Sequence, residues 1–135
     1  MEVVAEMFRS GGIWMYLVLA LSLLVYPGLL VSGVLFGSSF REGAPRRKRR
    51  LIAGAIPLLG AVALVAVGVV GWQLGLAEAH SAMEMASPES RQRMLARGEQ
   101  IAMYPLQAGA AMALIPGLVG LVFMVTGLLA SDDGE

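Results

Sequence analysis

Three long apolar stretches, separated by short polar segments, set the hydrophobic pattern of this chain. They cover residues 13–36, 51–75 and 105–130, and none of them contains a charged residue. A helix needs roughly 20 predominantly apolar residues to cross the hydrocarbon core of a bilayer. The pattern therefore predicts an all-α integral membrane protein with three transmembrane helices, organised as a single membrane domain over residues 1–135.

The polar segment between the first two apolar stretches, residues 37–50, is strongly basic. It holds six of the ten basic residues of the chain, namely Arg41, Arg46, Arg47, Lys48, Arg49 and Arg50. Because Lys and Arg in short loops remain on the cytoplasmic side, this segment is predicted to be a cytoplasmic loop. The N-terminus is then outside, residues 76–104 form an outer loop, and the C-terminus is cytoplasmic.

Within the outer loop, Ser87-Pro88-Glu89 has the composition of a helix start. Serine is a favoured N-cap, proline fits the first helical position, and the helix dipole favours an acid in the first turn. The following segment, Pro88 to Met103, carries apolar residues among charged ones, namely Met94, Leu95, Ile101 and Ala102 among Arg91, Arg93, Arg97 and Glu99. We therefore expect a short extracytoplasmic amphipathic helix before the third span.

The segment before the first apolar stretch, Met1 to Gly12, carries two Glu and one Arg. A signal peptide has a positively charged start, a short apolar core and a small-residue cleavage site. This weakly acidic segment and the long apolar stretch after it favour a retained first span.

Small residues recur along the second and third apolar stretches. They allow close approach of helix backbones, which is how helices associate in lipid. The predicted packing residues are Gly60, Gly68 and Gly71 in the second span and Gly109, Ala113 and Gly117 in the third. Gly33 with Gly37, and Gly71 with Gly75, also match the GxxxG pattern of helix contacts.

Composition narrows the function classes. The chain is 57% hydrophobic and has one histidine and no cysteine, so it offers no thiolate chemistry and little for a protein-only metal site. No nucleophile stands beside a base, and no Gly-rich loop follows a strand, so we predict no enzymatic activity, no cofactor and no metal. The positive-inside rule accounts for the basic loop, so we predict no nucleic-acid partner and expect contact with membrane lipids.

Four stretches, taken in order, resemble one family of membrane proteins. They are Gly11 to Ser22 (GGIWMYLVLALS), Pro57 to Gly60 (PLLG), Ser87 to Gly98 (SPESRQRMLARG) and Leu114 to Pro116 (LIP). Together they resemble the MotA/TolQ/ExbB proton-channel family. The resemblance implies a subunit of a bacterial inner (plasma) membrane that forms a homo-oligomer and works with a single-span membrane partner protein.

The chain departs from this family where ions would pass. The second span has no Thr, with Leu64 about where one is expected, and the third span opens without the family's acid and Thr residues. The large cytoplasmic insertion is also missing. Glu99 is either a displaced proton-path carboxylate or an exposed acid, and Gln107 either lines a polar pathway or bonds across helices.

Two functional hypotheses follow from these observations. The first is a proton-channel-like subunit with reduced or no ion conduction. The alternative is a non-conducting membrane assembly or accessory protein that binds partner helices. For Arg46 to Arg50, a topological role and recruitment of anionic lipid both remain open.

Overall fold

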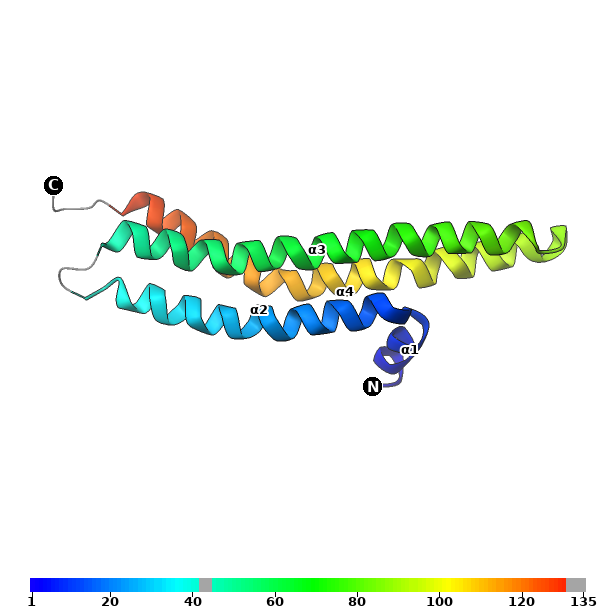
Figure 1. Ribbon diagram of the computed structural model, residues 1–135, viewed down its shortest axis with the longest axis horizontal. Helices are drawn as coiled ribbons and strands as arrows, with labels where there is room; N and C mark the ends of the chain where they lie inside the picture. Colours follow the sequence, from blue (N-terminus) through cyan, green and yellow to red (C-terminus); the bar gives the residue numbers. More distant parts are fainter. Residues whose placement is uncertain (42–44, 131–135) are drawn as a thin grey trace. The chain divides into compact units, whose positions relative to one another are not determined.

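The computed structural model describes residues 1–41 and 45–130, of which 92% are helical. These residues form four helices, α1 (Glu2–Ser10), α2 (Gly12–Ser38), α3 (Arg46–Glu84) and α4 (Pro88–Leu129) (Figure 1). Helices α2, α3 and α4 are each long and apolar enough to cross a membrane. The prediction of a helical, multi-pass membrane protein is confirmed. The acidic tail, Ser131 to Glu135, and residues 42–44 of the basic loop lie outside the described residues.

Residue contacts divide the chain into two units. The first unit comprises Met1–Ala20 and Leu64–Ala111. The second unit comprises Leu21–Ala63 and Met112–Glu135, of which residues 42–44 and 131–135 are not described. Each unit therefore contains one part of α2, one of α3 and one of α4, and α1 belongs to the first.

Helices α3 and α4 are much longer than their apolar stretches. They contain 39 and 42 residues, which at 1.5 Å per residue makes each about 60 Å long, against about 30 Å for the hydrocarbon core. The amphipathic segment before the third span is thus the continuous first part of α4. The segment after Gly75, expected as loop, continues α3 to Glu84, because it is rich in alanine, leucine, methionine and glutamate, which favour helix.

Arg46 to Arg50, expected in the loop, form the first turns of α3 directly after Pro45. At the other end of α2, the acidic N-terminal segment forms α1, none of whose residues is buried. The chain turns between the two helices at Gly11 and Gly12, and Gly12 has a φ of 60°. This left-handed conformation is readily available to glycine because it lacks Cβ.

Candidate functional site

In the first unit, α3 and α4 meet backbone to backbone. A Cβ placed on Gly68 would lie 2.8 Å from the carbonyl oxygen of Pro105, and one on Gly109 would lie 2.6 Å from that of Leu64. Both distances are shorter than real Cβ contacts, so not even a methyl group fits at either glycine. Leu64 is fully buried at this contact.

The second unit contains a similar contact between α3 and α4. A Cβ on Gly54 would lie 2.7 Å from the backbone nitrogen of Met124 and 2.8 Å from the carbonyl oxygen of Gly120. Of the other predicted packing residues in this unit, Gly60 lies against Val25 of α2 and Ala113 is buried. Gly117 is less crowded, since a Cβ there would lie 3.6 Å from the Cβ of Ala61.

The two GxxxG pairs have different surroundings. Gly71 lies against Pro105 and Trp14, and Gly75 lies against Ala102. A Cβ added to either glycine would lie 3.0 Å from the nearest side-chain carbon, which leaves no spare room. Gly33 and Gly37 are exposed on α2, and an added Cβ at either meets nothing within 4 Å. The pair Gly71–Gly75 therefore packs against other helices inside the first unit, whereas the pair Gly33–Gly37 faces open space on the second.

The two candidates for an ion path, Glu99 and Gln107, are both exposed on α4. They are eight residues apart, which is about 12 Å along a helix. Neither side chain forms a hydrogen bond or ion pair with another described residue. The structure therefore does not join them into one polar chain.

Buried polar side chains in the described part of the spans are few and mostly satisfied by nearby backbone. The Ser32 hydroxyl donates to the Gly28 carbonyl one turn earlier at 2.9 Å. Tyr26 donates to the Met112 carbonyl at 3.3 Å, connecting α2 with α4 within the second unit. Across residues 1–41 and 45–130, no buried side-chain nitrogen or oxygen lacks a hydrogen-bond partner. The Ser32 bond lies within α2, whereas the Tyr26 bond joins two helices.

Two of the basic residues hold the end of α2 against the start of α3. Arg49 Nη1 donates to both the carbonyl and the hydroxyl of Ser38 at 3.2 Å, and Arg50 Nε donates to the Ser39 hydroxyl at 3.1 Å. The Ser38 carbonyl belongs to the last residue of α2, where a helix has unpaired acceptors and favours cations. Arg49 therefore caps α2, and Arg50 binds the residue that follows this helix, in addition to any role in topology.

Arg50 also packs on aromatic rings. Its guanidinium carbon lies 4.8 Å from the ring centre of Phe40 and 5.5 Å from that of Phe36, within cation–π range. Phe36 in turn stacks on Phe123 of α4, with ring centres 4.1 Å apart. The contacts of Arg50 thus extend through Phe36 to all three long helices of the second unit.

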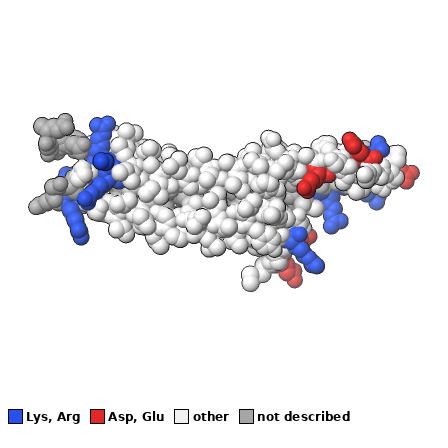
Figure 2. Space-filling view, viewed as in Figure 1, with Lys and Arg blue, Asp and Glu red and all other residues white. Residues whose placement is uncertain are grey.

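The remaining basic residues of the run, Arg46, Arg47 and Lys48, are exposed. Figure 2 shows blue side chains gathered where α2 ends and α3 begins, whereas red and blue side chains are mixed around the polar parts of the first unit. In the basic run, Arg49 and Arg50 thus contact the end of α2, and the other three residues are exposed.

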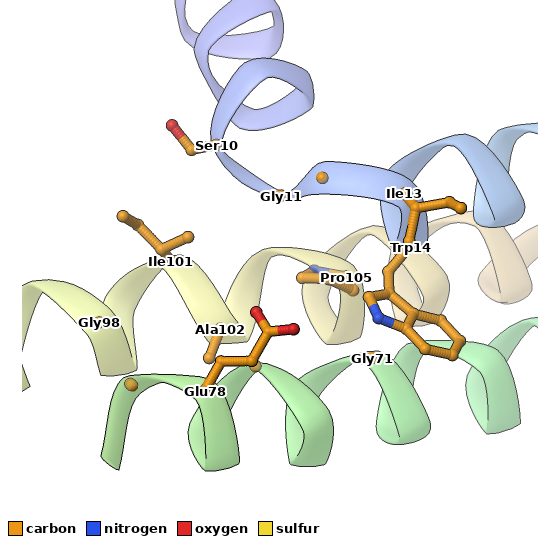
Figure 3. A pocket seen from close by; sticks show the side chains of 13 residues that line it. Ser10, Gly11, Ile13, Trp14, Gly71, Glu78, Gly98, Ile101, Ala102 and Pro105 are labelled. Carbon is orange, nitrogen blue, oxygen red and sulfur yellow. The ribbon is translucent and has the colours of Figure 1, made fainter. Parts of the chain in front are cut away.

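A pocket with a volume of about 400 Å³ lies in the first unit. It is bounded by the turn between α1 and α2, by α3 and by α4, and its lining residues are Ser10, Gly11, Gly12, Ile13, Trp14, Gly71, Gly75, Glu78, Ala79, Gly98, Ile101, Ala102 and Pro105. Figure 3 shows the Glu78 side chain extending from α3 into this space, beside α4 and the indole of Trp14. Three separate segments are needed to form it.

The pocket was not predicted from the sequence. Trp14 lies at the start of the first apolar stretch, and Glu78 lies just beyond the end of the second. The available signal was the position of both residues at the ends of apolar stretches, where a membrane helix passes the headgroup region. Comparison of the chain with models of protein families, with curated proteins and with solved structures gives no match.

Proposed function

We propose that this chain is a non-conducting assembly protein of a bacterial inner membrane, which binds partner helices through the exposed face of α2. One observation carries this proposal. Gly33 and Gly37 form a GxxxG pair with open space around both, whereas Gly54, Gly68 and Gly109 are already occupied by backbone contacts. A glycine pair on an exposed membrane-helix face favours close approach of a second helix.

The packing of α3 on α4 supports the non-conducting part of the proposal. An ion route needs groups that hold water or exchange protons, and ionisable residues inside spans mark such routes. The apolar stretches contain no ionisable acid, base or histidine. In both units, backbone contact at glycines fills the space between α3 and α4.

The assembly proposal is tested by placing bulk on the open glycines. Gly33→Leu and Gly37→Leu are expected to shift the purified protein toward smaller assemblies, measured by native mass spectrometry and by crosslinking in membranes. Ala20→Leu is the matched control, because Ala20 is a small exposed residue of α2 about 220° around the helix from Gly33. An assembly state unchanged by both glycine variants would refute the proposal.

A channel-like subunit of the MotA/TolQ/ExbB type is the second candidate. It is favoured by the four resembling stretches and by Gln107, a polar residue exposed in the third apolar stretch. In this case the ion route lies between chains, because Gln107 and Glu99 face outward from their unit. Proton flux into proteoliposomes separates the candidates: flux above background that Glu99→Gln or Gln107→Leu reduces would favour the channel and contradict the assembly proposal.

The proposed orientation has the N-terminus outside and the C-terminus in the cytoplasm. It rests on the basic residues between α2 and α3, since acids contribute little to the rule. A reporter active on only one side of the membrane, fused to the C-terminus, is expected to report the cytoplasm. Activity on the outer side would overturn this orientation.

A further inference from the structure

The pocket of the first unit lies where three helices change from apolar to polar. The first apolar stretch begins at Ile13, the second ends at Gly75, and the third begins at Pro105. All three residues are near or within the pocket lining. In a bilayer, such transitions occur at the headgroup region, where tryptophan is also enriched. The pocket is thus placed at the depth of lipid headgroups.

The charge of its lining residues gives the pocket a preference for cationic ligands. Glu78 is the sole charged side chain among its 13 lining residues, and no basic side chain lines it. The Glu78 side chain forms no hydrogen bond or ion pair with any other described residue. A carboxylate in this setting favours a cationic ligand group. The Trp14 ring beside it adds an aromatic face, the side-chain type that recognises ammonium groups most strongly.

The lining also limits the kind of molecule that fits. Apart from Glu78 and the Ser10 hydroxyl, its side chains are apolar or absent, including the 69% exposed Ile13 next to the apolar start of α2. The volume of about 400 Å³ is within the roughly 300–1,000 Å³ of small-molecule sites. A ligand with a small cationic head and an apolar tail matches both features.

We propose that this pocket binds a membrane lipid through its ammonium headgroup, with Glu78 pairing with the cation, Trp14 contacting it and the acyl chains lying along the exposed start of α2. The chemistry shared with a free soluble amine is the ammonium group. The depth of the pocket and the exposed apolar residues beside it favour the lipid. This binding does not depend on whether the chain assembles or conducts.

The test uses Trp14 as the reporter. The chain has two tryptophans, so Trp72→Phe leaves Trp14 alone, and Trp72 does not line the pocket. The full chain in detergent micelles is titrated with phosphatidylethanolamine or with phosphatidylglycerol, which lacks the ammonium. Indole emission and lipid retention in native mass spectrometry are measured. Phosphatidylethanolamine is expected to bind about fivefold more tightly, which corresponds to about 1 kcal/mol.

Two variants distinguish binding at the pocket from a general effect of negative charge on the protein. Glu78→Gln keeps the size of the side chain and is expected to abolish the preference for phosphatidylethanolamine. Glu84→Gln removes the same charge from an exposed residue of the same helix outside the pocket, and is expected to retain it. Helix content by circular dichroism confirms that both variants are folded.

Three results would overturn the proposal. The first is equal affinity of the unsubstituted Glu78 protein for the two lipids. The second is an unchanged preference in Glu78→Gln, or an equal loss in Glu84→Gln. The third is displacement of phosphatidylethanolamine by glycerophosphoethanolamine, its soluble headgroup, at equal concentration, which would show that the acyl chains contribute nothing and that the ligand is a free amine.

Discussion

Gly54 offers the most direct test of the backbone contact between α3 and α4. In Gly54→Ala the new methyl group would lie 2.7 Å from the backbone nitrogen of Met124, 2.8 Å from the carbonyl oxygen of Gly120 and 3.0 Å from the Met124 Cα. The shortest distance is about 0.7 Å less than the 3.4 Å at which ordinary van der Waals contact begins. Because all three neighbours are backbone atoms, no side chain can rotate away, and the helices themselves have to separate.

The expected magnitude combines two opposing terms. Overpacking a tight contact costs typically about 1–3 kcal/mol, since neighbouring atoms shift and lose their own contacts. Alanine in a helix interior recovers about 0.5–1 kcal/mol relative to glycine, because less conformational entropy is lost on folding. We therefore expect Gly54→Ala to lower the free energy of unfolding by about 1–2 kcal/mol.

Gly117→Ala is the matched control, because it lies at the same helix pair of the same unit but its new methyl group would sit 3.6 Å from the Ala61 Cβ. It is expected to be neutral or to gain up to about 1 kcal/mol from the entropy term alone. Reversible unfolding in mixed micelles with increasing SDS, followed by circular dichroism, measures both variants. Equal stability of the two variants, or a stabilised Gly54→Ala, would refute the close contact.

Two further predictions concern the second unit. Arg50→Lys keeps the positive charge but loses the fit over Phe40 and the bond to Ser39, so it is expected to lower the free energy of unfolding by about 1 kcal/mol, with topology unchanged in the reporter assay; an equal loss in Arg46→Lys, at an exposed residue, would contradict this. Tyr26→Phe keeps the ring but removes a single interhelical hydrogen bond of 3.3 Å, and it is expected to cost about 0.6 kcal/mol in the same SDS unfolding assay. A loss above about 2 kcal/mol would contradict the assignment of one ordinary hydrogen bond to this hydroxyl.

The spans were predictable because their signal is local. A run of apolar residues without charge needs no knowledge of the rest of the chain. Residues 13–36 and 51–75 each lie within one long helix, and so does the third stretch except for its last residue, Ala130. Helix ends were harder to predict. Residues 76–84 and the start of α4 carry polar side chains that are typical of a loop after a span. Their helical structure rests on helix-favouring residues and also on contacts between α3 and α4 such as that of Gly98 with Ala79. No local pattern reveals those contacts.

The candidate sites, too, were predictable only where their signal is local. The glycine-rich spans indicated close helix packing, but the same motif appears at Gly33–Gly37, which is open, and at Gly71–Gly75, which is occupied. Which glycine meets a neighbour depends on how each helix is rotated about its axis. Many residues far apart in the chain set that rotation together.

The sequence by itself determined that this is a helical protein with three apolar spans and one strongly basic connection, because the cost of placing charges or unpaired backbone groups in hydrocarbon acts on each segment separately. Only the tertiary structure decided that Arg50 rests on aromatic rings of the second unit and that Trp14 and Glu78 line one pocket. These arrangements depend on contacts between side chains of different helices. Such contacts follow from how the helices pack, which the order of residues along any one helix does not specify.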